Sequence, residues 1–235
     1  MCTVTYLPIA HGFVLTHNRD EAPARSQHGL SRTGALLFPQ DAKAGGAWIA
    51  AARDGRTACL LNGAFVKHRH EPPYRRSRGL VLLDFFEWPD PDDFFERYDL
   101  AGIEPFTFLF FQSERVVELR WDGARRYVAE LPPGQPHFWC SATLYPPDMQ
   151  TRREGVFRDW LGHHSRTAAR RLPAALLDLH LTGSVGDPEN DYVMNRAERV
   201  RTVSVTQVLR QEQRVRMRYV DLLAGKREMR YFPGR

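Results

Sequence analysis

The chain has 235 residues, of which 43% are hydrophobic and 11% aromatic, and its formal net charge is +5 at pH 7. This length and composition argue against an intrinsically disordered protein, because a chain of this size can bury a large apolar core. No stretch approaches the roughly 18 apolar residues of a membrane span and no secretory leader is evident, so we expect a cytoplasmic protein without a membrane span. No linker or repeat divides the chain, which predicts a single domain over residues 1–235.

Cysteine and arginine usage indicates the redox compartment and the partners that the protein could have. The three cysteines are Cys2, Cys59 and Cys140. They are too few and too scattered for a disulfide scaffold, which fits a reducing compartment. Arginine supplies most of the positive charge and clusters in three segments, at 74–78, 166–171 and 214–218. No nucleic-acid-binding motif accompanies these clusters, so we expect solvated surface and no nucleic-acid partner. The chain carries no pattern that indicates an oligomeric state.

The first predicted element is a β-hairpin. Segments 2–7 and 12–17 are short, β-branched and aromatic, and the sequence PIAHG between them is turn chemistry. With a symmetric turn, the numbers of opposed residues sum to about 19, which places Cys2 opposite His17. At a rise of about 3.4 Å per residue, the Arg19-Asp20 pair then lies within side-chain reach of Cys2.

The rest of the chain alternates groups of strands and helices. Strands are predicted at 47–51, 56–61, 105–111, 115–121, 125–131, 201–209 and 214–220. Helices are predicted at 77–87, with Ser77 as N-cap, and at 90–98, 150–163 and 173–181. The apolar strand PFTFLFF at 105–111 lacks polar alternation and should be covered on both faces. Two packed sheets with helices outside satisfy this pattern, so we predict an α+β layered sandwich of mainly antiparallel sheets.

The pairing of Cys2 with the Arg-Asp segment suggests nucleophilic chemistry. If Met1 is removed, Cys2 carries both a thiol with a pKa of about 8.5 and an α-amine with a pKa of about 8. The amine can take the proton of the thiol and later return it to a leaving group. Arg19 would favour the thiolate and orient an anionic substrate group, and Asp20 would hold the α-ammonium by a hydrogen bond.

Each of these residues also has a plain structural interpretation. Cys2 alone would be a small apolar residue on a first strand. The segment Asn18-Arg19-Asp20-Glu21 alone would be a polar turn with a surface ion pair that contributes little to stability. Their joint placement is what favours chemistry.

Four stretches together carry a resemblance to a known family: MCT at the start, HNRDE at 17–21, Gly45-Gly46-Ala47-Trp48 and Leu61-Asn62-Gly63. They resemble the NRDE family, that of transport and Golgi organisation protein 2. This family is in turn similar to the cysteine-type N-terminal nucleophile (Ntn) hydrolases, among them penicillin V acylases and bile salt hydrolases. The resemblance implies a four-layer αββα sandwich and cleavage of a non-peptide C–N amide, in a small molecule, through an acyl-cysteine intermediate without a required cofactor.

The resemblance also assigns catalytic roles. Cys2 matches the nucleophile, and Arg19 with Asp20 match the pair that supports it. Asn62 falls where hydrolase relatives place an oxyanion-hole donor, which would stabilise the tetrahedral intermediate; a plain tight turn is the equal alternative there. Arg201 resembles a late arginine that closes the hydrolase site.

Substrate contacts are expected from four further residues: Asn18, Glu21, Trp48 and Ser141. For Trp48, packing in the core is the competing interpretation, and the glycines before it would allow a close approach of the backbone. The relatives usually follow the serine with an asparagine that completes the oxyanion hole, whereas this chain has Ala142. The loss of one such donor costs about 2.7–4 kcal/mol of transition-state stabilisation.

The alternative function is a non-catalytic binding or carrier protein of the same fold that holds haem or another hydrophobic anion. Ala142 and the basic segment 67–78 support it, because His68 and His70, or the later His163-His164 pair, would offer axial ligands to haem. Eukaryotic relatives in the resembled family have been linked to haem and lipid handling. A solvated loop is the simpler interpretation of these histidines, and we expect no metal site.

Overall fold

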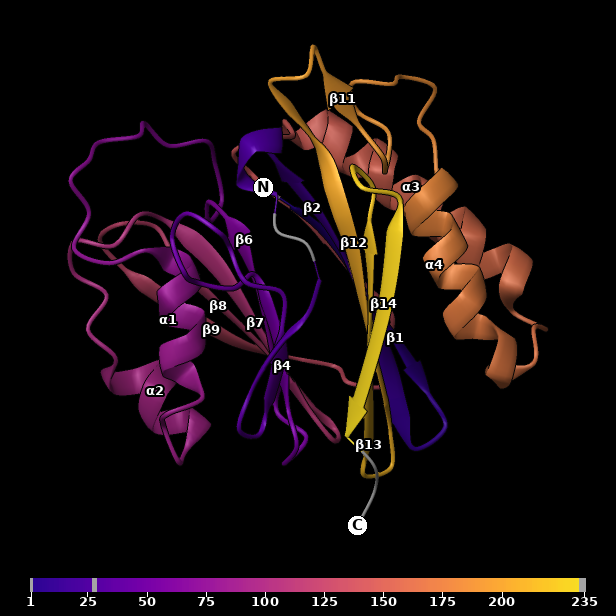
Figure 1. The fold of residues 1–235 in the computed structure, drawn as a ribbon, viewed down its shortest axis with the longest axis horizontal. Helices are drawn as coiled ribbons and strands as arrows, with labels where there is room; N and C mark the ends of the chain where they lie inside the picture. The colour runs from indigo at the N-terminus through magenta and orange to yellow at the C-terminus, as the bar shows by residue number, and fades with distance from the viewer. Residues whose placement is uncertain (1, 27–28, 233–235) are drawn as a thin grey trace.

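The structure is a computed structural model that describes residues 2–26 and 29–232. Two β-sheets pack face to face, and a pair of helices covers the outer face of each (Figure 1). Every pairing between the described strands is antiparallel. The predicted four-layer αββα sandwich is confirmed.

The sheets each contain seven strands. Sheet I has the order β10 (His137–Cys140), β1 (Cys2–Ile9), β2 (Gly12–Glu21), β12 (Val200–Gln211), β13 (Arg214–Asp221) and β14 (Lys226–Phe232), with β11 (Asn195–Arg196) paired to β12. Sheet II has the order β3 (Ser31–Thr33), β4 (Leu36–Phe38), β5 (Ile49–Ala52), β6 (Thr57–Asn62), β7 (Phe106–Gln112), β8 (Arg115–Trp121) and β9 (Arg126–Leu131).

All four predicted helices are present: α1 (Arg78–Phe85), α2 (Pro91–Arg97), α3 (Pro147–His164) and α4 (Leu172–Thr182). Helices α1 and α2 lie on sheet II, and α3 and α4 lie on sheet I (Figure 1). Ser77 occupies the N-cap position of α1, although its side chain makes no capping hydrogen bond. Within the described ranges, no helix is both long and apolar enough to cross a membrane.

The first hairpin corrects the predicted register. Ile9 pairs directly with Gly12, so the turn is only two residues long and both strands extend further than predicted. Cys2 therefore lies opposite Arg19, and His17 lies opposite Val4. Gly12 allows β2 to lie close to β12, because a Cβ there would lie 1.9 Å from the carbonyl oxygen of Arg210. The correction brings Arg19 closer to Cys2 than the sequence implied.

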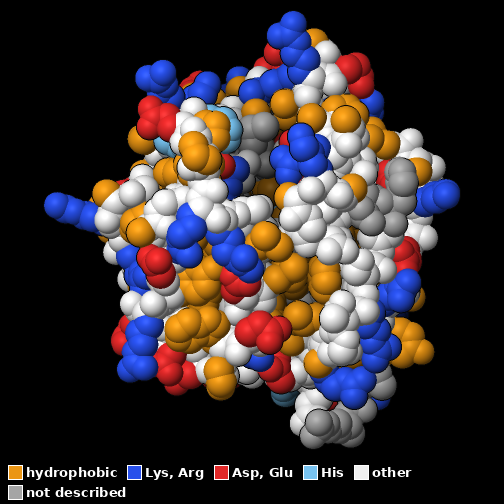
Figure 2. Space-filling model, turned by 60° about the vertical axis from the view of Figure 1, so that its left-hand side comes forward, with side chains coloured by type: hydrophobic (Ala, Val, Ile, Leu, Met, Phe, Trp, Pro, Cys, Tyr) orange, Lys and Arg blue, Asp and Glu red, His pale blue; other side chains and the backbone are white. Residues whose placement is uncertain are grey.

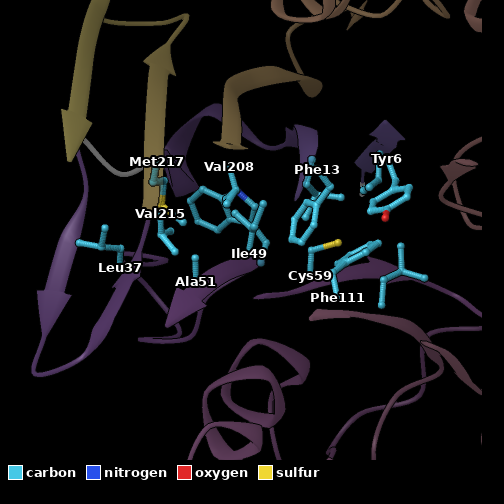
Figure 3. Close-up of a cluster of buried hydrophobic side chains, with 14 of the residues drawn as sticks. Tyr6, Phe13, Leu37, Ile49, Ala51, Cys59, Phe111, Val208, Val215 and Met217 are labelled. Carbon is cyan, nitrogen blue, oxygen red and sulfur yellow. The ribbon is translucent and has the colours of Figure 1, made fainter. Parts of the chain in front are cut away.

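The apolar core forms three layers. Between the sheets, Phe13 and Val208 of sheet I face Ile49 and Phe111 of sheet II (Figure 3). The rings of Phe13 and Phe111 have centroids 5.8 Å apart. Outside sheet I, strand β2 packs against α3 and α4. The inner and outer faces of each sheet are therefore both covered.

Strand β7 shows why the apolar run was a reliable signal. Phe108 and Phe110 point outward to α1, where their rings lie 5.1 and 5.3 Å from that of Phe85. Leu109 and Phe111 point inward to sheet I. The prediction that this strand is covered on both faces is confirmed.

Five short or polar strands were not predicted from the sequence: β3, β4, β10, β11 and β14. Strands of two to four residues are too short to show a period, and β14 is a largely exposed edge strand rich in charged residues. On the face drawn in Figure 2, Lys and Arg side chains alternate with acidic ones and form no single basic patch.

Candidate active site around Cys2

Cys2 is the first residue of β1, an inner strand of sheet I that lies between β10 and β2. Its side chain is 3% exposed and belongs to the layer between the sheets. The amide of Ser141 donates a hydrogen bond of 2.9 Å to the carbonyl oxygen of Cys2. Cys2 lines a small cavity of about 90 Å³, called here the Cys2 cavity, together with residues of β2, the loop before β5, the end of β6 and the start of α1.

Arg19 is held rigidly beside Cys2. It is 4% exposed, and its guanidinium forms an ion pair with Asp41 and donates a hydrogen bond of 2.9 Å to the carbonyl oxygen of Arg25. The same guanidinium lies over the ring of Trp48, 4.0 Å from its centroid. These contacts fix a positive charge at the wall of the Cys2 cavity, where sequence reasoning expected it.

Asp41 is a site residue that the sequence did not indicate, because no motif surrounds it. Burial alone would raise the pKa of Asp41, but hydrogen bonds from the amides of Ala44 and Lys43 and the charges of Arg19 and Arg25 outweigh it, so this pKa is lowered. Asp41 is therefore a carboxylate at neutral pH and balances the charge of Arg19. The Cys2 cavity thus contains a neutralised ion pair rather than a free cation.

Asp20 points to the opposite face of β2 from Arg19, because successive side chains of a strand alternate. Its carboxylate is fully buried and accepts hydrogen bonds from the hydroxyls of Tyr145, at 2.9 Å, and Thr202, at 2.7 Å. Burial raises the pKa of Asp20, while the charge of Arg153 and these two hydrogen bonds oppose the rise. The predicted supporting pair is therefore divided between two layers, and only Arg19 lines the Cys2 cavity.

The thiol of Cys2 is not activated by its surroundings alone. Burial raises its pKa, the charge of Asp20 raises it further, and the charge of Arg19 lowers it. The net direction is upward, so the thiol is protonated at neutral pH. Nucleophilic attack at this residue would need a base that accepts the proton.

Of the predicted substrate contacts on β2, Glu21 lines the Cys2 cavity and Asn18 does not. The side-chain amide of Asn18 donates to the carbonyl oxygens of His180, at 2.9 Å, and Tyr192, at 2.7 Å, and its oxygen contacts the His180 ring. Asn18 thus ties β2 to α4 and lies away from the Cys2 cavity. Glu21 lines the cavity and accepts a hydrogen bond of 2.8 Å from Arg25.

Asn62 and Ser141 meet beside Cys2, although 79 residues separate them in sequence. The hydroxyl of Ser141 donates a 2.7 Å hydrogen bond to the backbone oxygen of Asn62. Asn62 is half-buried and lines the Cys2 cavity. Ala142 lines a neighbouring cavity of about 100 Å³ with Phe65 and Cys140, and not that of Cys2.

Trp48 and Arg201 complete the residues predicted from sequence. Trp48 lines the Cys2 cavity, and its indole N–H is buried without a hydrogen-bond partner. Both interpretations of Trp48 are therefore compatible with its place, since it also packs in the core between the sheets. Arg201 lies opposite Glu21 in the strand register, binds Glu198 at 2.9 Å and does not line the cavity.

Arg78 is a second site residue that the sequence did not reveal. It belongs to the basic run at 74–78, which we interpreted as solvated surface, yet it lines the Cys2 cavity and pairs with Glu104 at 2.9 Å. Burial lowers its pKa, although Glu104 opposes this.

A Cβ at Gly46 would lie 2.4 Å from the carbonyl carbon of Gly79, so glycines bring the loop before β5 and helix α1 together here as expected.

The histidines considered for haem lie elsewhere. His68 and His70 both bond the carboxylate of Glu104, at 3.0 and 3.1 Å, and neither lines the Cys2 cavity. His164 stacks on Trp160 with ring centroids 4.4 Å apart. Across residues 2–26 and 29–232, no group of three or more His, Cys, Asp or Glu side chains is placed to hold a metal ion.

The sequence matches the profile of the family described as Transport and Golgi organisation 2 over residues 1–219. The chain belongs to this family. No curated protein matches the chain. The match to the family profile confirms the resemblance that the NRDE segment indicated.

Solved structures with the same fold are Ntn hydrolases. An N-acylethanolamine-hydrolyzing acid amidase ortholog from Caenorhabditis elegans has a TM-score of 0.59 at 13% identity, covering 89% of this chain and 92% of that one. The mutant C2A conjugated bile acid hydrolase from Clostridium perfringens has a TM-score of 0.54 at 9% identity, covering 100% and 97%. Penicillin V acylase from Agrobacterium tumefaciens has a TM-score of 0.56 at 7% identity, covering 97% and 85%. At these identities the likeness shows the fold, which this family member shares with them.

Proposed function

We propose that this protein is a cytoplasmic N-terminal cysteine amidohydrolase that cleaves a non-peptide C–N amide of a small molecule. The observation that carries the proposal is the position of Cys2, which lines a cavity together with Arg19 and Asn62. The structures that share its fold are named as an acid amidase, a bile acid hydrolase and an acylase, all of which act on amides.

The proposed reaction begins with proton transfer from the thiol of Cys2. Because burial raises the pKa of this thiol, a base must accept its proton, and the free α-amine of Cys2 would do so after removal of Met1. Met1 itself lies outside the described residues. The sulfur then attacks the amide carbon, and the side-chain amide of Asn62 would donate to the resulting oxyanion.

Collapse of the tetrahedral intermediate breaks the C–N bond. The departing amine takes the proton from the α-ammonium, which leaves an acyl-cysteine thioester. Water then attacks the thioester while the α-amine accepts its proton. The C–S bond breaks, the carboxylic acid leaves, and the α-ammonium returns the proton to the sulfur of Cys2. Arg19, fixed by Asp41 and Trp48, would orient a polar or anionic group of the substrate at the cavity wall.

The test begins with the intact mass of the untagged protein, which should be short by one methionine. Purified protein is then assayed with a panel of N-acylethanolamines, conjugated bile acids and penicillin V. We expect turnover of at least one amide class, and its loss in Cys2→Ala and Cys2→Ser while the melting temperature is unchanged. Retention of Met1, or turnover that survives in Cys2→Ala, contradicts the proposal.

A carrier function for a hydrophobic anion is the second candidate. It is favoured by the raised pKa of the Cys2 thiol and by Ala142, whose side chain supplies no oxyanion donor. Haem is the probe for this candidate, and a saturable shift of its absorbance that survives in Cys2→Ala would support it. A titration without a saturable shift would remove the haem version.

A further inference from the structure

A larger cavity of about 790 Å³ lies between the sheets at the end of the molecule opposite Cys2. Turns from both sheets surround it, including the hairpin that joins β1 to β2 and the turn that joins β7 to β8. It shares no lining residue with the Cys2 cavity. Seven residue steps along β1 separate Cys2 from Ile9, which is about 24 Å of extended strand.

Arg210 indicates which kind of ligand this cavity, called here the far-end cavity, could bind. In the register of sheet I it pairs with Phe13 on one side and Val215 on the other, and both of these side chains belong to the core between the sheets. The side chain of Arg210 therefore also points inward. It is 8% exposed and lines the cavity. Its guanidinium packs against Gly55 in the turn between β5 and β6, where its Nη1 is inaccessible and has no hydrogen-bond partner.

No carboxylate of the described residues pairs with Arg210. Asp54 is near enough to favour its charged form, but the Asp54 carboxylate is engaged by Arg56 at 2.8 Å. Glu114 and Glu212 also line the far-end cavity, yet both are exposed and neither bonds the guanidinium. Burial lowers the pKa of Arg210, as expected for a cation without a partner. A buried charge of this kind is costly unless an anion or hydrogen-bond acceptor reaches it.

The remaining walls of the far-end cavity are mixed, with His11 and Ser113 beside the two glutamates on one part and apolar side chains on the other. Tyr6, Pro8 and Ile9 contribute to the apolar part, and the hydroxyl of Tyr6 is already used in a 2.9 Å hydrogen bond to the Pro133 carbonyl. We propose that this cavity binds a carboxylate that carries a short hydrocarbon chain. The carboxylate would accept two hydrogen bonds from the Arg210 guanidinium, and the chain would lie against Pro8 and Ile9. The site is separate from Cys2 and does not depend on the proposed amidase activity.

The test is isothermal titration calorimetry of the full chain with octanoate, with octanol as a neutral ligand of the same length. We expect saturable binding of octanoate and at least about tenfold weaker binding of octanol, because only the carboxylate can pair with Arg210. Arg210→Gln should weaken octanoate binding by about tenfold or more, and Arg210→Lys by less. Arg216→Gln is the matched control, since Arg216 lies on the neighbouring strand β13 but does not line the cavity.

A second variant keeps the test decisive if Arg210→Gln fails to fold. Gly134 lines the far-end cavity, and a Cβ there meets no atom within 4 Å, so Gly134→Trp should fill the space without strain. It should abolish octanoate binding, whereas Cys2→Ala should leave that binding unchanged. Equal binding of octanoate and octanol, binding that is unaffected by Gly134→Trp, or absence of saturable octanoate binding would overturn the proposal.

Discussion

The two faces of strand β2 show how one short segment serves two environments. On the inner face, Arg19 and Glu21 line the Cys2 cavity and form ion pairs with residues of the neighbouring loops. On the outer face, Asn18 and Asp20 are fully buried in a polar layer beneath α3 and α4. The contrast teaches that residues adjacent in a motif need not share a role, because strand alternation separates them by a whole sheet.

The outer polar layer is unusually rich in charge for a buried region. Arg153 of α3 is fully buried, donates to Thr3 at 2.6 Å and lies 4.1 Å from the centroid of the Tyr145 ring. Tyr145 and Thr202 in turn bind the Asp20 carboxylate. We therefore expect changes on the outer face to act on folding first, and changes on the inner face to act on chemistry first.

The largest expected effect is that of Asp20→Ala. It removes the acceptor for two buried hydroxyls and the counter-charge near Arg153, so the free energy of unfolding should fall by about 3–5 kcal/mol. Urea denaturation measures the change, and Asp20→Asn, which keeps the shape of the side chain, is the matched control with a smaller loss. A fully stable Asp20→Ala protein would show that the outer layer does not support the fold.

A comparison of two asparagines sharpens the contrast. Asn18→Ala leaves the carbonyl oxygens of His180 and Tyr192 without this donor and should lower the free energy of unfolding by about 1–3 kcal/mol. Asn62→Ala removes a half-buried side chain at the wall of the Cys2 cavity, so its melting temperature should change little. If Asn62 donates to the oxyanion, its replacement should instead lower kcat by about 10²–10³-fold on any amide that the protein turns over. Unchanged turnover in Asn62→Ala would exclude that role.

The pH dependence of stability provides a third comparison. Burial lowers the pKa of His17 on the inner face to about 3, although the Leu60 carbonyl opposes this. The unfolded chain then binds more protons than the folded one between about pH 3 and 6.5, so stability is present above that range and lost as the pH falls through it. His17 alone should account for about 2 kcal/mol between pH 6.5 and 5.

Urea titrations at pH 7 and pH 5 measure this effect. The variant His17→Gln should lack the part of the pH-dependent loss of unfolding free energy that His17 causes. His180 on the outer face, whose pKa burial also lowers, should add a loss of the same sign that remains in His17→Gln. The raised pKa of Asp20 acts in the opposite direction, since protonation stabilises the folded form there. An equal pH dependence in the wild type and His17→Gln would contradict the assignment.

The smallest expected effect is that of Arg201→Gln. This residue pairs with the exposed Glu198 outside the Cys2 cavity, so its replacement should change the free energy of unfolding by about 0.5 kcal/mol or less. Glu198→Gln, which removes the other side of the same pair, is the control. A large loss of turnover in Arg201→Gln but not in Glu198→Gln would support the catalytic role that the resemblance implies.

The site was only partly predictable from the sequence. The nearness of Cys2 and Arg19 followed from the hairpin, because both strands are continuous and joined by a short turn. The two-residue error in register came from the turn itself, where Ile9 and Gly12 already pair. Asp41 and Arg78 were not predicted, since neither stands in a motif and each reaches the Cys2 cavity only through folding of a long loop.

The helices, the long strands, their layered order and the family can be predicted from local patterns, because periods of two and 3.6 residues and the NRDE segment are local signals. The tertiary structure alone reveals which face each residue of that segment occupies, that Ser141 meets Asn62, and that Arg210 lines the far-end cavity. These features arise from pairings between strands far apart in the chain. Such pairings depend on register and burial, which no local pattern encodes.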